Sequence, residues 1–263
     1  MTDTTNQDSH VPAKTLDADA VRRVAEGKHA DQSKLRRFLM DHRPAIGSFV
    51  VLVVMLGCFY FGNPEVFSQW NMYRAVLIGL PVVLFVVVPL VYVVTVGEID
   101  LSFPSTIGMS GWVFALVVQA GFDPLIGIVA AAATGLFLGV CVGWLVVYAN
   151  LSSLIATLGM NFMLRGLIQI NTEGKSIALV TLPKSLAYQI FGGQYFGIPV
   201  QVLWALLFVV VCSLVYNRHR FGVHVHMVGD NPDAAQQMGI NVKLVRLKAF
   251  ALVGLGAAFA GVA

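Results

Sequence analysis

Long apolar runs dominate this sequence and limit the folds that it can adopt. Runs of about 17 to 25 residues recur from Ala45 onwards, and a helix of that length crosses the roughly 30 Å hydrocarbon core of a bilayer. Only 12% of the residues are charged, against about 25% in an average soluble domain. The pattern predicts an all-α, polytopic helical membrane protein embedded in a lipid bilayer.

We predict about six complete transmembrane helices and a partial last one. The complete spans are expected at about 45–62, 75–96, 104–120, 125–149, 154–171 and 200–216. The last starts at about residue 249 and holds 15 residues, or about 22 Å of helix, which is short of the hydrocarbon thickness. From that length we expect the chain to be truncated at its C-terminus.

The distribution of basic residues predicts the orientation. Residues 1–44 are expected to form a partly disordered basic tail before the membrane domain 45–263, and a polar loop spans 217–248. The tail carries eight basic residues: Lys14, Arg22, Arg23, Lys28, Lys34, Arg36, Arg37 and Arg43. The loop 217–248 carries five: Arg218, Arg220, Lys243, Arg246 and Lys248. The outer connections carry only Arg74, Lys175 and Lys184. Cytoplasmic loops are enriched in Lys and Arg, so the N-terminus and the loop 217–248 are expected inside.

Small residues recur at every fourth position of the span 125–149, namely Ala131, Gly135, Gly139 and Gly143. Such a stripe lets two membrane helices approach closely. It predicts helix packing within one subunit, with a subunit interface as the alternative.

Two carboxylates lie between apolar spans in the stretch "GEIDLS", residues 97–102. Asp100 or Ser102 can cap the helix that follows, and Pro104 suits its first turn. In the alternative, Glu98, Asp100 and Ser102 border a polar path through the membrane, where irregular backbone is tolerated because it faces water or protein.

Arg165 lies inside the span 154–171, and Asn161 precedes it by four residues, on the same helix face. An ionisable residue at that depth usually faces the protein interior or a water-filled cavity. We expect Asn161 and Arg165 to line a path or to form an internal polar contact; the alternative is that Arg165 extends to the outer interface.

The basic loop contains "GDNPDAAQQMGI", residues 229–240. Asp230 or Asn231 can cap a helix, Pro232 suits its first turn and Gly239 suits its end. A helix of about two turns is therefore expected at 230–239, and an ordinary connector is the alternative.

Three other patterns indicate no catalytic or metal site. "EGKS", 173–176, lacks the first glycine of a phosphate-binding loop, because Gln169 occupies that position. His224 and His226 have no third ligand cluster beside them, so we expect no metal. Cys58, Cys141 and Cys212 all lie within apolar runs and are expected to act as small hydrophobic residues.

Three motifs, in this order along the chain, resemble the simple-sugar branch of the permeases of ABC importers, the ribose, xylose and galactose type. "GEIDLS" is similar to its Gly-Gly-Ile-Asp-Leu-Ser, and "NLSSLIATLGMNFMLRGL", 150–167, is similar to its Pro-Ser-Phe-Ile-x-Thr-Leu-Gly and Arg-Gly elements. "GDNPDAAQQMGINV" resembles its cytoplasmic coupling loop, with Asp233 where Glu is usual.

The resemblance implies a multi-pass permease of the bacterial inner membrane that imports a monosaccharide or similar small polyol. The implied partners are an ABC ATPase subunit, a periplasmic sugar-binding protein and a second permease subunit, identical or not, and no nucleic acid is expected. Such a chain is not an enzyme and holds no cofactor, because ATP binds to the partner. The resemblance implies that the following residues dock on the ATPase: Asp230, Asn231, Pro232, Asp233, Ala234, Ala235 and Gly239.

Three other functions remain open on the sequence. One is an ABC permease for branched-chain amino acids, a neighbouring family. Another is a secondary transporter driven by an ion gradient through Glu98 or Asp100, although this leaves the helix at 230–239 unexplained. The third is a non-functional fragment of a permease.

Overall fold

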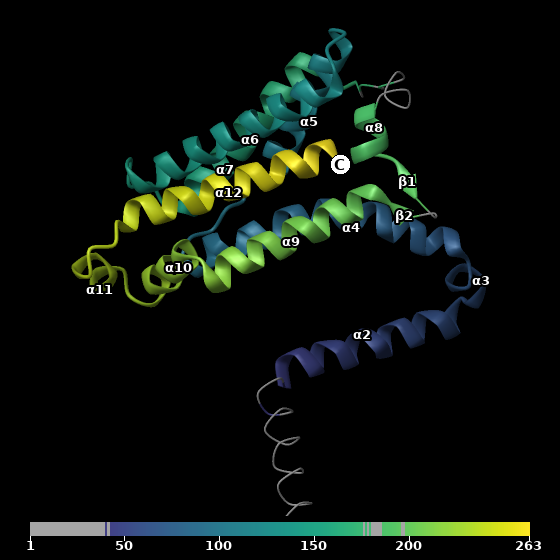
Figure 1. Cartoon of the computed structure of the whole chain (residues 1–263), viewed down its shortest axis with the longest axis horizontal. Coiled ribbons are helices and arrows are strands. Elements are labelled where there is room, and N and C mark those ends of the chain that lie inside the picture. The colour runs from purple at the N-terminus through teal and green to yellow at the C-terminus, as the bar shows by residue number, and fades with distance from the viewer. Residues whose placement is uncertain (1–39, 41–42, 176, 178, 180–185, 196–197) are drawn as a thin grey trace, which may run out of the picture. The chain divides into compact units, whose positions relative to one another are not determined.

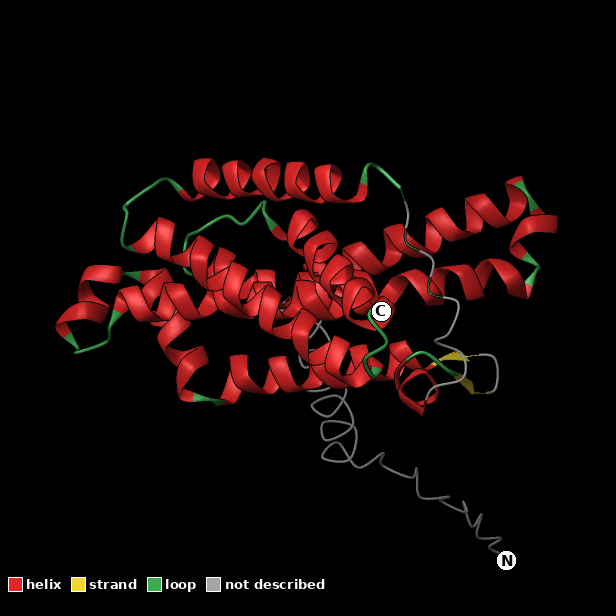
Figure 2. Cartoon of the chain, turned by 90° about the horizontal axis from the view of Figure 1, so that it is seen from above, coloured by secondary structure: helices red, strands yellow, loops and turns green. Residues whose placement is uncertain are grey.

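The computed structural model describes residues 40, 43–175, 177, 179, 186–195 and 198–263 (Figure 1). The described chain is almost entirely helical, with one two-stranded hairpin (Figure 2). Within it, five helices are long and apolar enough to cross a membrane, and the apolar segments Ile46–Gly62 and Phe103–Gln119 are shorter. The predicted all-α polytopic class is confirmed. The predicted tail, 1–44, lies outside the described residues except for positions 40, 43 and 44.

The elements follow one another in this order: α2 (Arg43–Gly62), α3 (Pro64–Phe67), α4 (Trp70–Thr95), α5 (Phe103–Gln119), α6 (Pro124–Val147), α7 (Ser153–Thr172), α8 (Leu186–Phe191), β1 (Gln194–Tyr195), β2 (Ile198–Pro199), α9 (Val200–Arg218), α10 (Arg220–Asp230), α11 (Pro232–Gln237) and α12 (Val242–Val262). β1 and β2 pair antiparallel, with Tyr195 opposite Ile198. The chain divides into two compact units, Met1–Gln69 and Trp70–Ala263.

The first unit contains α2 and α3. Exposed apolar side chains line α2, including Phe49 and Phe61. A helix that is apolar on all sides is typical of a membrane span. Asn63 caps the short α3 by accepting a hydrogen bond from the Val66 N–H (3.4 Å).

In the second unit, α12 lies between the α4–α9 pair and the α5–α6 pair (Figure 1). Its buried residues are small or apolar, among them Ala249, Val253 and Ala257. Glycines at the contacts bring it close to its neighbours: a Cβ on Gly254 would lie 2.1 Å from the Gly135 carbonyl oxygen of α6. The small-residue stripe of α6 therefore packs within one chain, as predicted.

The contact of α12 with α4 lies beside a proline. Pro89 lies inside α4 and has no N–H, so it cannot donate the helical hydrogen bond to the Phe85 carbonyl. Gly256 of α12 approaches this carbonyl so closely that a Cβ there would lie 2.1 Å from the oxygen. α4 continues as a helix through both Pro81 and Pro89, because neighbouring helices support a broken hydrogen-bond ladder in such spans.

Helix boundaries agree with the predicted spans to within a few residues for α5, α6, α7 and α9. The last helix is longer than predicted, because Asn241 caps it by accepting from the Leu244 N–H (3.0 Å) and the helix begins at Val242. Its 21 residues make it long enough to cross a membrane. Hydropathy underestimates its length because Lys243, Arg246 and Lys248 occupy its first turns, where their charges lie at or near the surface.

Candidate functional site

The predicted helix at 230–239 is the second of two consecutive helices. α10 ends at Asp230 and α11 begins at Pro232, so the loop 217–248 contains more helix than predicted. Asn231, between the two helices, caps α11 with its side-chain oxygen, which accepts from the backbone N–H groups of Asp233 (3.1 Å) and Ala234 (3.0 Å). Pro232 fits the first helical position because no N–H is needed there.

The end of α11 is closed by a left-handed residue. Gly239 has a φ of +83°, which glycine adopts at little cost. Its N–H donates to the Gln236 carbonyl (2.9 Å), and the Ile240 N–H donates to the Ala235 carbonyl (3.1 Å). These two bonds form a Schellman motif. α11 is thus capped at both ends and is a defined short helix despite its length of six residues.

The two alanines of α11 differ in burial. Ala235 is fully buried against the bundle, whereas Ala234 is exposed. Of the other residues predicted to dock on a partner, Pro232 is half-buried and these are exposed: Asp230, Asn231, Asp233 and Gly239. Met238 adds an apolar group that is 61% exposed. The outer face of α11 therefore presents short and polar side chains beside one large apolar one.

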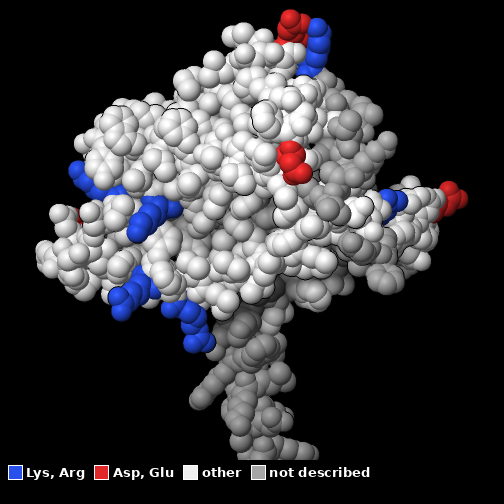
Figure 3. Space-filling view, turned by 45° about the horizontal axis from the view of Figure 1, so that its top comes forward, with Lys and Arg blue, Asp and Glu red and all other residues white. Residues whose placement is uncertain are grey.

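Basic side chains surround this end of the bundle. Figure 3 shows Lys and Arg gathered over the region of α10, α11 and the start of α12. The described basic residues there are Arg218, Arg220, Lys243, Arg246 and Lys248. Lys243 lies over the Tyr148 ring, 5.6 Å from its centroid.

Asp100 lies in the α4–α5 turn, residues 96–102, and is buried. One carboxylate oxygen accepts from the Ser102 N–H (2.7 Å) and from the Ser102 hydroxyl (2.6 Å). Burial raises the pKa of the Asp100 carboxyl, and the two hydrogen bonds from Ser102 oppose that shift. Asp100 therefore supports the turn that starts α5, and the Ser102 side chain donates to Asp100 instead of accepting from the helix.

Glu98, in the same turn, forms an ion pair. Its Oε1 lies 3.3 Å from Arg246 Nη1 near the start of α12, and its side chain is only 12% exposed. The structure therefore brings the first carboxylate of the motif to the α10–α12 region. Neither Glu98, Asp100 nor Ser102 lines the larger polar cavity described next.

Asn161 and Arg165 do share a cavity. It lies between α5 and α7, has a volume of about 720 Å³, and is called the polar groove; its lining residues are Pro104, Ser105, Gly108, Asn161, Arg165, Ile168, Gln169, Thr172, Gly174 and Lys175. The Ser105 hydroxyl donates to the Asn161 backbone carbonyl (2.8 Å) and also contacts the Asn161 side-chain oxygen. Asn161 and Arg165 thus line one cavity from the same face of α7, although Arg165 is exposed, and their place in a translocation path stays a prediction.

The chemistry of the polar groove is hydroxyl, amide and cationic. Arg165 and Lys175 supply the charges, and Lys175 pairs with Glu173 just beyond the lining. No acidic side chain lines the described part of the groove. Such a surface can donate to and accept from the hydroxyl groups of a neutral polar solute.

Sequence reasoning missed Ser105 and Thr172 as groove residues. Both are small hydroxyl residues at helix ends, where such residues are common, so spacing alone does not distinguish them. Their role becomes visible only once α5 and α7 are placed side by side.

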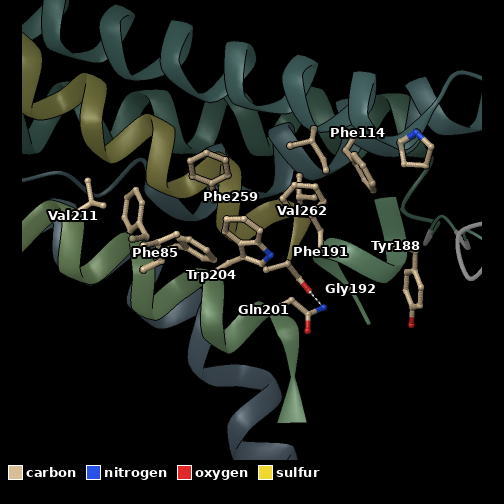
Figure 4. A pocket seen from close by; sticks show the side chains of 15 residues that line it. Phe85, Phe114, Tyr188, Phe191, Gly192, Gln201, Trp204, Val211, Phe259 and Val262 are labelled. Carbon is tan, nitrogen blue, oxygen red and sulfur yellow. Dashed lines mark hydrogen bonds between the residues drawn. The ribbon is translucent and has the colours of Figure 1, made fainter. Parts of the chain in front are cut away.

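A second cavity is apolar and has a volume of about 450 Å³. Aromatic side chains from several helices surround it, among them Phe85, Phe191, Trp204 and Phe259 (Figure 4). The Trp204 ring N–H donates to the Ile190 carbonyl (2.9 Å), and the Gln201 amide donates to the Ala263 carbonyl (3.2 Å). These bonds engage two of its polar groups, so its chemistry does not suit a hydroxyl-rich solute.

The structure shows where the glycine-lysine motif and the two histidines lie, which the sequence analysis did not assign to a catalytic or metal site. Gly174 and Lys175 lie in the turn that ends α7, not between a strand and a helix. His224 and His226 lie on α10, and the His226 ring contacts the Tyr216 ring at 4.5 Å between centroids. Within the described residues, no three His, Cys, Asp or Glu side chains come together as metal ligands.

The chain is similar in sequence to a family of known transport proteins. Residues 72–263 match the family described as "Branched-chain amino acid transport system / permease component". The chain is 29% identical to the D-allose transport system permease protein AlsC of Escherichia coli K12 over 82% of its own length and 66% of that protein. It is 28% identical to the L-arabinose ABC transporter permease protein AraH of Azospirillum brasilense, over 82% of its own length and 62% of that protein.

A third relative is the ribose import permease protein RbsC of Bacillus subtilis, which is 30% identical over 83% of this chain and 66% of that protein. The chain thus spans less than two thirds of the length of each of these three relatives. No solved structure matches it.

Proposed function

Because this chain belongs to the permease-component family of the branched-chain amino acid transport system, we propose that it is the membrane-spanning permease subunit of an ATP-binding-cassette importer. The proposed cargo is a monosaccharide or a similar small polyol. Relatives named for D-allose, L-arabinose and ribose support this choice of cargo.

The observation that carries the cargo proposal is the lining of the polar groove. A branched-chain amino acid has a carboxylate, which Arg165 or Lys175 can bind, but it also has an ammonium group, which favours a carboxylate or several oriented acceptors, and an apolar side chain. The described lining has hydroxyl and amide groups and two cations, but no carboxylate. Sugar hydroxyls need only hydrogen-bond partners, and Ser105, Asn161 and Arg165 supply them.

The energy would come from a partner. In this proposal the exposed face of α11 docks on a separate ABC ATPase subunit, which binds and hydrolyses ATP, and the permease itself is not an enzyme. A periplasmic binding protein delivers the cargo, and a second permease subunit completes the path. A capped helix with the exposed Ala234 and Met238 on its outer face suits docking, because its shape is set before the partner arrives.

The orientation follows from charge. The five basic residues around α10 and α12, and the eight in the tail, support a cytoplasmic location for both. The polar groove, near the end of α7, would then open toward the outer side, where a binding protein releases its cargo. The expected location is the bacterial inner membrane.

Uptake of radiolabelled sugars in cells that carry the complete transporter tests the proposal. We expect saturable uptake of at least one pentose or hexose, and its loss when the ATPase partner is inactivated. Uptake that survives ATPase inactivation would indicate an ion-coupled transporter. Uptake of leucine or isoleucine without any sugar would indicate the amino acid permease.

Asn161→Ala tests the groove itself. The Ser105 hydroxyl keeps the Asn161 backbone carbonyl as its acceptor, so the variant is expected to fold. Loss of one hydrogen bond to the cargo is worth about 0.5–1.5 kcal/mol, so uptake at low sugar concentration should fall by about 2- to 13-fold. The control is Phe162→Ala on the same helix, since Phe162 is 69% exposed and does not line the groove. Equal uptake in the two variants would exclude Asn161 from the path.

A further inference from the structure

The α10–α11 segment contacts the rest of the bundle at α9, at α12 and at the end of α4. Thr95 is the last residue of α4, and Gly229 in the last turn of α10 lies against its carbonyl, where a Cβ would be only 2.1 Å from the oxygen. The Thr95 hydroxyl is also 2.9 Å from the Tyr216 hydroxyl of α9. Backbone in such close contact moves together, because any slip would separate or overlap packed atoms.

Glu98 makes a second connection between the α4–α5 turn and this region, to α12, the helix that follows α11 in the chain. Its backbone is held firmly, because the Glu98 N–H donates to the Val93 carbonyl (3.0 Å) and the Gly97 N–H donates to the Val94 carbonyl (3.0 Å). Gly97 has the left-handed φ of +83° that this helix end requires. The carboxylate therefore projects from a fixed support toward Arg246 of α12, at 3.3 Å.

The α4–α5 turn also holds the starts of the two helices that line the polar groove. Asp100 accepts from the backbone and side chain of Ser102, the residue before α5. The Ile99 N–H donates to the Ser153 hydroxyl at the first residue of α7 (3.3 Å). The Ser102 carbonyl in turn accepts from the Thr106 N–H in the first turn of α5 (3.1 Å). One short segment, 95–102, thus contacts α10 and α12, which precede and follow α11 in the chain, and the first turns of α5 and α7.

We propose that residues 95–102 form the mechanical link between α11 and the polar groove, and that Glu98 and Arg246 are a positioning pair in this link. Movement of α11 reaches the turn through Gly229 and Arg246, and the turn carries it to α5 and α7. Neither Glu98 nor Arg246 lines the groove, so the pair acts on the coupling of movement and not on cargo binding. This inference rests on the proposed function.

The test measures sugar uptake and ATP hydrolysis together, with the assembled transporter in proteoliposomes. Glu98→Gln and Arg246→Gln should each lower the number of sugars moved per ATP hydrolysed by about twofold or more, with an unchanged KM for the sugar. The double variant Glu98→Arg with Arg246→Glu should restore the ratio. Glu65→Gln is the control, since Glu65 is an exposed carboxylate in the first turn of α3 that does not line the groove.

A second readout does not depend on transport. Amide hydrogen exchange of the detergent-solubilised protein should accelerate by about two- to fivefold in Glu98→Gln, both in α11 and at the start of α5, and return in the double variant. A faster exchange confined to α11, or an unchanged transport ratio in the single variants, overturns the link. If the wild-type transporter shows no ATP-driven sugar uptake, the proposed function fails, and the exchange result still decides the link.

Discussion

Gly254→Ala is expected to weaken the contact between α6 and α12. A methyl group at this position would lie 2.1 Å from the Gly135 carbonyl oxygen and 2.8 Å from the Gly139 Cα. Real Cβ contacts essentially never fall below 3.0 Å, so the helices must separate by about 0.9 Å (3.0 − 2.1) or the backbone must distort. Overpacking of this kind costs about 1–3 kcal/mol.

A matched substitution isolates this contact from helix propensity. Alanine is more favourable than glycine in any helix interior by about 1 kcal/mol, which partly hides the clash. Gly159→Ala in α7 gains the same propensity, yet a Cβ there meets no atom within 4 Å. The difference in the free energy of unfolding between the two variants should therefore be about 1–3 kcal/mol, in favour of Gly159→Ala.

Thermal unfolding in detergent, followed by size-exclusion chromatography of the heated samples, measures the difference. A change of 1 kcal/mol shifts the midpoint by about 2–4 °C in a domain of 150–250 residues, so Gly254→Ala should unfold about 2–12 °C below Gly159→Ala. If Gly254→Ala unfolds at the same temperature as Gly159→Ala or above it, the close α6–α12 packing is refuted.

Three further substitutions probe separate contacts. Asp100→Ala removes the acceptor of two buried hydrogen bonds and should lower the free energy of unfolding by about 1–3 kcal/mol, whereas Asp100→Asn keeps an acceptor oxygen and should cost less. Equal thermal midpoints for the two variants would contradict this. Tyr92→Phe removes the hydroxyl that donates to the Cys212 carbonyl between α4 and α9 (2.5 Å); we expect a loss of about 0.6 kcal/mol, and at most about 1.7, in the same assay. A loss above that limit would mean that Tyr92 does more than make this bond. Asn231→Ala removes the cap of α11, worth about 0.5–2 kcal/mol, and should speed amide exchange in α11 while Asn231→Asp does not; unchanged exchange in the alanine variant would argue against the cap.

Much of the fold follows from local features of the sequence. The apolar runs predict where helices α5, α6, α7 and α9 begin and end to within a few residues. Each run is long enough to cross the hydrocarbon core of the bilayer, where the backbone must satisfy its hydrogen bonds internally, so each run is expected to form a helix. The capped α11 was predictable for the same reason, since Asn231, Pro232 and Gly239 act on their near neighbours.

Helix α10 escaped prediction because its apolar face is narrow. Gly222, Val225 and Val228 are buried, but polar residues and histidines separate them in the sequence. Whether such a segment forms a helix depends on what its apolar face packs against, and Gly222 packs on the end of α9. The early start of α12 was hidden for a related reason, because its first turns carry charged residues.

Some features of the candidate site likewise follow from local sequence, and others depend on the tertiary structure. The predicted partnership of Asn161 with Arg165 needs only the repeat of one helix, and it is present in the polar groove. Other features depend on how α5, α7 and α12 are placed and rotated about their axes. These are the presence of Ser105 in the polar groove, the hydrogen bonds from Ser102 to Asp100, and the Glu98–Arg246 ion pair. Hydropathy and capping act over a few residues and can be recognised along the chain. Rotation and contact between helices arise from the packing of all side chains at once, so only the tertiary structure decides them.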